Sequence, residues 1–338
     1  MNTNHIRPSI RRRSLAGLLT AGALLAAGAG LATEHAAAAG TARVANGTLV
    51  VSGDRAPDRI ALRLEAGVAT NVQVDFGDDG TADATFDRAT FDRIVVRAAG
   101  GDDAVRIDDA NGTFTDTEST TVNGGGGDDT LLGGGGAEFF SGGPGDDTID
   151  GNRGNDVAFM GSGNDTFIWD PGDGSDVVEG ERGYDTMDFN GAPGPETFSA
   201  SPDGARLRFL RQPGNILMDT DGVERVDVDA LGGADAVTVD DLSGTDVAKV
   251  RVDLAADLGG ATPDATADTV VVNATPGDDD IDVRPRGGAA VLSGLAATVV
   301  VAAPDPALDT LTVNLLGGDD VVRVGAGLGG LIRTAANA

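Results

Sequence analysis

The sequence predicts an all-β protein, in which a coil of short parallel strands lies within or between further β-solenoid or β-sheet repeats. Three observations predict this fold class: a composition that favours turns, a nine-residue Gly/Asp motif that repeats in phase, and alternating apolar residues on both sides of it. Of 338 residues 52 are Gly, about twice the usual share, and Asp supplies 46 of the 54 acidic groups. Because Gly and Asp are poor helix formers, this composition excludes a helical fold.

The charge and the missing residue types exclude several classes of function. A net charge of −30 repels phosphate, so we expect no nucleic-acid partner. The chain has no Cys, and its two histidines are His5 and His35. Both lie in the segment that we expect to be removed, so the mature chain cannot build a Ser–His–Asp triad or a His-ligated zinc site. We therefore expect no catalytic residues and no enzyme activity.

Residues 1–39 have the pattern of a cleaved signal peptide. The run Arg11, Arg12 and Arg13 precedes an apolar stretch over 15–32, and small residues follow at 36–39. Cleavage there changes the net charge from −30 to −33. No later segment is long and apolar enough to span a bilayer, so we expect no membrane span after cleavage. The expected location is extracellular, with the cell envelope as an alternative.

Seven copies of a nine-residue unit occupy residues 124–188, with Gly common at positions 1, 2 and 4, an acid at 6 and an apolar residue at 8. Examples are GGGGDDTLL, GGPGDDTID and MGSGNDTFI, and a two-residue insertion, Trp169-Asp170, precedes the sixth copy. The copies begin at Gly124, Gly133, Gly142, Gly151, Met160, Pro171 and Gly180. Gly supplies the positive φ that the turn needs, and the residues after it form a short strand whose apolar member points inward.

Stacking of these turns places carboxylates above one another, and their repulsion would unwind the coil. A hard cation between successive loops relieves the repulsion, and ligation by oxygen alone in a flexible loop favours Ca²⁺. The position-6 acids are Asp129, Glu138, Asp147, Asp156, Asp165, Asp176 and Asp185.

The seven copies resemble the repeats-in-toxin (RTX), or hemolysin-type calcium-binding, nonapeptide family. The resemblance implies a right-handed parallel β-roll with two nonapeptides per turn, and therefore two columns of loops. Asp129, Asp147, Asp165 and Asp185 would form one column, and Glu138, Asp156 and Asp176 the other. The gaps between loops would hold several calcium ions, up to about five. The implied metal-binding residues are Gly124, Gly125, Gly127, Asp129, Gly133, Gly136, Glu138, Gly142, Gly145, Asp147, Gly151, Gly154, Asp156, Gly161, Gly163, Asp165, Gly172, Gly174, Asp176, Gly183 and Asp185.

The flanks carry a longer unit of strand, Gly/Asp turn and strand, as in IVVRAAGGDDAVRI from Ile94 and TLTVNLLGGDDVVRV from Thr310. We expect a signal peptide at 1–39, β-repeats at 40–123, the calcium-binding roll at 124–190 and β-repeats at 191–338. An isolated GGDD, such as the turn with Asp103, is expected to be a tight turn with solvated carboxylates. Residues 198–218 predict a β-hairpin that turns at 202–204, and its three arginines are expected to pair with carboxylates, with an anionic glycan as the alternative.

The sequence therefore predicts a secreted calcium-binding structural or interaction protein, whose repeats fold on binding Ca²⁺ outside the cytosol. Two alternatives stay open. One is a polysaccharide-active β-helix enzyme that resembles polyuronate lyases or epimerases, and the other is an adhesin or matrix protein. A partner at the cell surface or among glycans is not identified by any motif.

Overall fold

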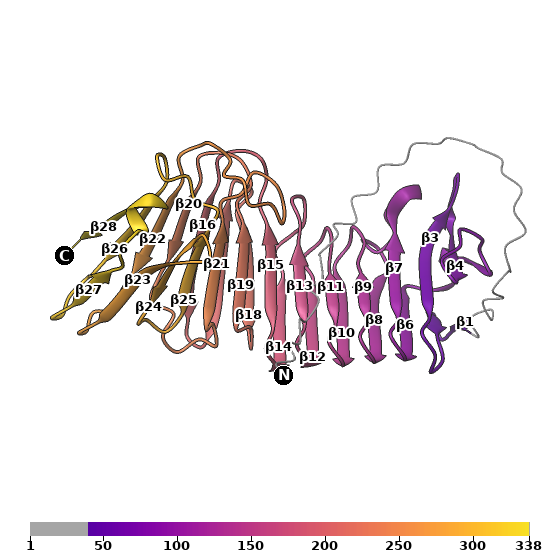
Figure 1. Cartoon of the computed structure of the whole chain (residues 1–338). Helices are drawn as coiled ribbons and strands as arrows, with labels where there is room; N and C mark the ends of the chain where they lie inside the picture. The colour runs from indigo at the N-terminus through magenta and orange to yellow at the C-terminus, as the bar shows by residue number, and fades with distance from the viewer. Residues whose placement is uncertain (1–39, 338) are drawn as a thin grey trace, which may run out of the picture.

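The computed structural model describes residues 40–337, which form two long β-sheets joined into one coil (Figure 1). The predicted signal peptide lies outside these residues. Each sheet has 14 strands, and the chain passes repeatedly from one sheet to the other. The all-β class and the parallel β-roll are thus confirmed. No helix in 40–337 has the length and apolar character to cross a membrane.

We call the two sheets sheet 1 and sheet 2. In spatial order, sheet 1 contains β1 (Thr41–Ala45), β2 (Thr48–Ser52), β6 (Arg93–Gly100), β8 (Ser119–Gly126), β10 (Glu138–Pro144), β12 (Val157–Gly163), β14 (Val177–Gly183), β18 (Ile216–Asp221), β17 (Arg206–Gln212), β16 (Thr197–Asp203), β20 (Ala236–Val239), β22 (Thr269–Asn273), β26 (Thr310–Asn314) and β28 (Arg333–Asn337). Sheet 2 contains β27 (Val321–Val324), β23 (Asp280–Arg286), β24 (Ala289–Ser293), β25 (Thr298–Ala302), β21 (Lys249–Asp253), β19 (Arg225–Asp229), β15 (Thr186–Asn190), β13 (Thr166–Trp169), β11 (Thr148–Asp150), β9 (Thr130–Leu132), β7 (Ala104–Asp108), β3 (Arg59–Glu65), β4 (Val68–Phe76) and β5 (Ala84–Asp87). Three short 3-10 helices are η1 (Arg88–Thr90), η2 (Asp109–Asn111) and η3 (Leu328–Gly330).

Parallel pairing between successive turns fixes the register of the roll. In sheet 2, Thr130 pairs with Thr148, Thr148 with Thr166, and Thr166 with Thr186. These steps of 18, 18 and 20 residues confirm two nonapeptides per turn. The insertion at 169–170 is accommodated by one further residue in β13 and a turn after it, so the register on either side is kept.

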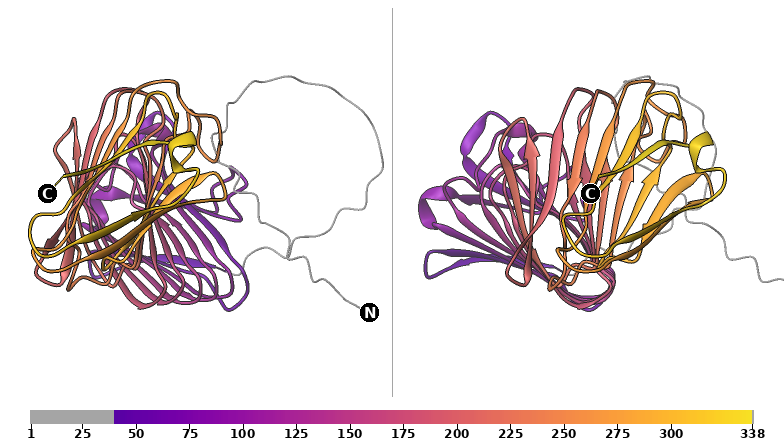
Figure 2. Two further views of the ribbon diagram at one scale, coloured as in Figure 1. Left: turned by 60° about the vertical axis from the view of Figure 1, so that its left-hand side comes forward. Right: turned by 90° about the vertical axis from the view of Figure 1, so that its left-hand side faces the viewer.

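The coil has two edges where loops stack, and both are seen in the turned views of Figure 2. At edge 1 the chain passes from sheet 1 to sheet 2, as between β8 and β9. At edge 2 it returns from sheet 2 to sheet 1, as between β11 and β12. Both sheets continue through residues 123 and 190, and the division into separate regions there stays a prediction.

Antiparallel insertions interrupt the coil at three places. Strands β16, β17 and β18 form one in sheet 1, and β23, β24 and β25 form another in sheet 2, while β3, β4 and β5 end sheet 2. The predicted hairpin over 198–218 is confirmed as β16 and β17, which turn between Asp203 and Arg206, and β18 adds a third antiparallel strand.

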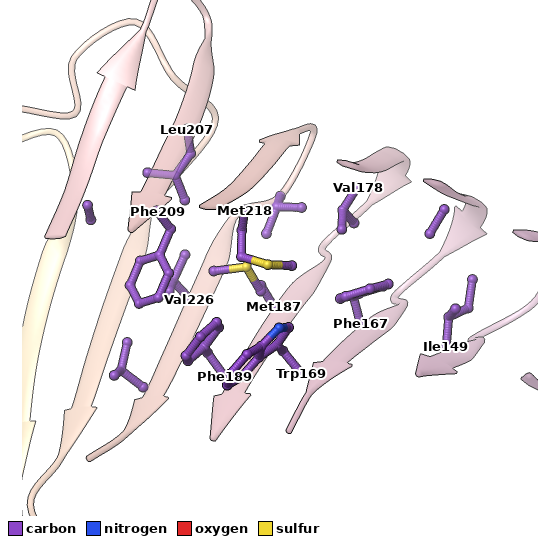
Figure 3. Close-up of a cluster of buried hydrophobic side chains, with 14 of the residues drawn as sticks. Ile149, Phe167, Trp169, Val178, Met187, Phe189, Leu207, Phe209, Met218 and Val226 are labelled. Atoms are coloured by element: carbon purple, nitrogen blue, oxygen red, sulfur yellow. The ribbon is translucent and has the colours of Figure 1, made fainter. Parts of the chain in front are cut away.

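The core is a continuous column of apolar side chains between the sheets (Figure 3). All seven position-8 residues are fully buried, as predicted. The insertion contributes Trp169, whose ring stacks on Phe189 with centroids 4.1 Å apart. The guanidinium of Arg211 lies 5.1 Å from the centre of the Trp169 ring. The inserted residue thus extends the core rather than disrupting it.

Candidate metal centre

The acids of the edge 1 loops form a ladder in which each residue is held by the next turn. The backbone N–H of Asp129 donates to Oδ1 of Asp147 at 2.8 Å, and that of Asp147 donates to Oδ1 of Asp165 at 2.7 Å. The same contact repeats at 2.7–2.8 Å from Asp58 to Glu224. We call this run the edge 1 ladder, and its members are Asp58, Asp103, Asp129, Asp147, Asp165, Asp185 and Glu224.

The second predicted column lies at edge 2. The N–H of Glu138 donates to Oδ1 of Asp156 at 2.7 Å, and the N–H of Asp156 donates to Oδ1 of Asp176 at 2.8 Å. The two 20-residue steps, which end at Asp176 and Asp185, keep the same contact as the 18-residue steps. The structure therefore brings the predicted acids together in the two predicted columns.

One carboxylate oxygen of most ladder residues has no hydrogen-bond partner. Each of these residues is at most 3% exposed. In the two columns the unpartnered atoms are Oδ2 of Asp103, Asp129, Asp147, Asp156, Asp165 and Asp185, and Oε1 of Glu138. A buried carboxylate without a counter-charge is costly. The ladders are therefore short of positive charge.

The electrostatics of the ladders agree with that deficit. Burial, with a smaller contribution from the neighbouring carboxylates, raises the pKa of Asp129 and Asp165 to about 7. Burial likewise raises the pKa of Asp147 and Asp185 to about 6 and that of Asp156 to about 9. A bound cation would favour the ionised form of each group and release the protons.

Position-1 glycines form a cradle that leaves room beside the unpartnered Oδ2 atoms of Asp129, Asp147, Asp156 and Asp185. A Cβ placed on Gly142 would lie 2.4 Å from Oδ2 of Asp147 and 2.4 Å from the carbonyl oxygen of Met160, one turn away. A carboxylate oxygen and a carbonyl oxygen thus flank one spot that only Gly leaves free. Within 40–337 no three Asp, Glu or His side chains converge on a point, so a cation here would take its further ligands from carbonyl oxygens such as that of Met160 or from water. One carboxylate with several carbonyls is a donor set that suits Ca²⁺.

Glycines at positions 2 and 4 allow the turns to approach closely. A Cβ on Gly143 (φ +118°) or on Gly145 (φ +142°) would lie only 2.0 Å from a carbonyl oxygen of the preceding turn. Gly172, at position 2 of the sixth copy, has φ +121° and open space around it. The loop after the insertion is therefore looser at its start, although Gly174 again packs on Gly154.

A second, outer ladder was not predicted. In this ladder the position-5 side chain accepts a hydrogen bond from a backbone N–H of the following turn, whereas in the position-6 ladders the side chain accepts from the preceding turn. Asp146 N–H donates to Asp128 Oδ1 at 2.9 Å. Asn164 N–H donates to Asp146 Oδ1 at 2.7 Å. The sequence signal for this ladder is the Asp or Asn at position 5 in GGGGDD, GGPGDD and MGSGND.

The expectation that Asp103 sits in a solvated turn is wrong. Asp103 is 2% exposed, and its N–H donates to Asp129 Oδ1 at 2.8 Å. Because β6 and β8 pair in parallel, the loop of Asp103 stacks directly on the first repeat. Its backbone also matches, since Ala99 takes φ +92° and Gly101 takes φ +108°.

The arginines of the predicted hairpin pair largely with carboxylates, as expected. Arg206 contacts Glu179 at 2.9 Å and Asp219 at 2.5 Å, and Arg211 forms an ion pair with Glu196. These two side chains are thus engaged within the protein.

Comparison with known proteins places the repeats in a described family. The family model "RTX calcium-binding nonapeptide repeat (4 copies)" matches residues 116–148, 132–167 and 171–188. No curated protein matches the sequence. Among solved structures, the crystal structure of extracellular lipase LipA from Serratia marcescens is similar at 11% identity, over 65% of this chain and 43% of that chain, with a TM-score of 0.20. This chain thus covers less than half of that lipase chain.

Proposed function

The segment 116–188 carries RTX calcium-binding nonapeptide repeats, and from that premise we propose that the protein is a secreted, calcium-dependent structural or interaction protein. In this proposal the roll folds on binding Ca²⁺ outside the cytosol.

The observation that carries the proposal is the run of unpartnered, buried carboxylate oxygens beside glycine cradles. Asp129, Asp147 and Asp165 would each contribute Oδ2, and position-1 carbonyls such as that of Met160 would contribute further oxygens. When bound, calcium supplies the positive charge that the ladders lack. The chain itself contributes the stacked backbone that orients these oxygens and the glycines that leave room beside them.

An extracellular site of action follows from the expected affinity. Extracellular calcium modules bind at roughly 10⁻⁴–10⁻³ M, far above cytosolic calcium. Ions that bind only the folded state stabilise it by linkage, so at neutral and higher pH the roll would stay unfolded until calcium is plentiful. The loop gaps in the two predicted columns give the proposed upper number of about five ions.

We propose no catalytic role. Residues 40–338 contain neither His nor Cys. An open depression of about 440 Å³ lies near β23 and β27, but its arginines Arg284 and Arg323 are paired with Asp282 and Asp280. No contact in the described part of the chain favours the polyuronate-active alternative. Release of unsaturated sugars from polyuronates by the purified protein would contradict this part of the proposal.

A calcium titration tests the proposed function. The mature chain is freed of calcium on a chelating resin and followed by far-UV circular dichroism, sedimentation velocity and calorimetry. We expect β-content and compactness to rise with calcium, and Asp147→Asn to bind fewer ions than the wild type. Identical dichroism and sedimentation with and without calcium would overturn the proposal.

A further inference from the structure

A further carboxylate ladder occupies edge 2 in the C-terminal half, outside the segment that the RTX family matches. Backbone N–H groups again donate to the Oδ1 atom of the next turn: Glu196 to Asp235 at 2.7 Å, Asp235 to Asp268 at 2.8 Å, and Asp268 to Asp309 at 3.0 Å. We call Glu196, Asp235, Asp268 and Asp309 the C-terminal ladder. Its steps are 39, 33 and 41 residues, so no short sequence period reveals it.

Both ends of the C-terminal ladder are satisfied within the protein. Glu196 accepts from Arg211 Nε at 2.6 Å and from the N–H of Ala192 at 2.7 Å. Asp309 Oδ2 accepts from the N–H of Asp305 at 2.6 Å. Each carboxylate oxygen of the two terminal residues therefore has a hydrogen-bond donor.

The two central carboxylates are different. Asp235 and Asp268 are each 2% exposed, and Oδ2 of each is buried without a hydrogen-bond partner. No Arg or Lys of the described chain is recorded within ion-pair distance of either one. Nearby Asp264 adds negative charge, and its own oxygens accept from the N–H groups of Gly233 and Thr266. This part of the ladder therefore has the same charge deficit as the RTX loops.

The neighbouring gap of this ladder, between the loops of Glu196 and Asp235, reproduces the RTX cradle, whereas the next two loops begin with Ala230 and Pro263. A Cβ on Gly191 would lie 2.6 Å from Glu196 Oε2 and 3.0 Å from the carbonyl oxygen of Ala230, one turn away. This is the arrangement found around Gly142, where the acid of the same loop and the position-1 carbonyl of the next turn flank the glycine. In the loop over 230–235, Leu231 (φ +64°) and Gly233 (φ +127°) take positive φ at positions 2 and 4, as the repeats do.

We propose that the loops over 230–235 and 263–268 form a calcium site in the C-terminal half, with Oδ2 of Asp235 and Oδ2 of Asp268 as its carboxylate ligands. This site extends beyond the proposed function, which concerns the RTX segment alone. Oxygen donors from stacked, flexible loops favour Ca²⁺ over Mg²⁺, which demands a rigid octahedron. Burial also raises the pKa of both carboxyl groups to about 7, in line with a missing counter-charge.

The test counts bound calcium in the full mature chain. Asp235→Asn/Asp268→Asn keeps the Oδ1 acceptors but removes both charges, and equilibrium dialysis at saturating calcium measures the ions per chain. We expect at least one ion fewer than in the wild type. Asp309→Asn is the matched control from the same ladder, and we expect it to bind as many ions as the wild type. A double variant with the wild-type number of ions would overturn the proposal.

A third variant separates this proposal from the proposed function. If Asp147→Asn lowers the ion number and Asp235→Asn/Asp268→Asn does not, the RTX function stands and the C-terminal site is wrong. The converse result would leave the C-terminal site and refute the role of the RTX loops. Should the double variant fail to fold, each single Asn variant is counted in the same way. An unchanged ion number in both would overturn the C-terminal site.

Discussion

Two glycines at the same repeat position offer a matched test of how closely the turns must approach. Gly143 and Gly172 both occupy position 2, with φ of +118° and +121°. A Cβ on Gly143 would lie 2.0 Å from the carbonyl oxygen of Gly125, whereas a Cβ on Gly172 would meet nothing within 4 Å. Alanine at either site suffers the same conformational strain, about 1–2 kcal/mol. Only Gly143→Ala adds a clash with the backbone.

The size of that added cost can be worked out from the neighbouring contacts. Since Cβ atoms are essentially never found closer than 3.0 Å to another atom, the loops of Gly125 and Gly143 would have to separate locally by about 1 Å. The separation would stretch two hydrogen bonds. In one the N–H of Gly127 donates to the carbonyl oxygen of Pro144 at 2.9 Å, and in the other the N–H of Asp129 donates to Oδ1 of Asp147 at 2.8 Å. Each hydrogen bond contributes about 1 kcal/mol net, so the strain and the two bonds together give about 3–4 kcal/mol for Gly143→Ala.

Urea unfolding of the calcium-saturated mature protein, followed by circular dichroism, measures the difference. We expect Gly143→Ala to lower the free energy of unfolding by at least twice as much as Gly172→Ala, and to weaken calcium binding in calorimetry. Equal losses of stability in the two variants would refute the stacking of these loops.

Three further predictions follow from the ladders and the core. Asp103→Asn and Asp147→Asn should lower the calcium-dependent unfolding midpoint by similar amounts, because both lie in the edge 1 ladder with an unpartnered Oδ2; a silent Asp103→Asn would contradict this. Without calcium, the unfolding midpoint should decrease as the pH is raised from about 5 to about 8. Asp129 and Asp165 have pKa values raised to about 7, so the folded state binds protons more tightly than the unfolded state and loses this stabilisation as the pH rises. Saturating calcium should abolish that fall, and a midpoint that rises with pH in calcium-free buffer would count against it. The fluorescence of Trp169, fully buried in the fold, should shift to the red when calcium is removed at neutral pH, and an unchanged spectrum would show that its core survives without the ion.

The sequence alone predicts the two columns whose acids recur with a short period. Asp129, Asp147 and Asp165 recur every 18 residues, so the stacking partner of each loop can be counted along the chain. The inward-pointing apolar residues follow from the same phase. The insertion at 169–170 shifts the count but not the pairing, because strand register rather than residue number aligns the loops.

The remaining ladder residues could not be found in this way because their spacing is set by insertions. Asp103 precedes Asp129 by 26 residues, with η2 and its loop between them. Asp235 and Asp268 are separated from their partners by whole strands, among them the β16–β18 and β23–β25 insertions. Parallel pairing across such insertions decides which loops stack, and a single sequence does not reveal that pairing.

The placement of the unpartnered oxygens indicates how the coil is held together. Where a ladder begins, at Asp58 and at Glu196, the carboxylate accepts from an N–H of its own loop, whereas the central residues leave Oδ2 without a donor. A central loop therefore depends on its neighbours in two ways: the next turn supplies the acceptor for its N–H, and a cation shared with that turn would supply its missing charge. Since each turn of a solenoid contacts only adjacent turns, stability passes along the coil through these interfaces. A cation at one interface orders the loop that forms half of the next site, so binding along a ladder should be cooperative. The ends, whose carboxylates are hydrogen-bonded within their own loops, mark where that cooperativity stops.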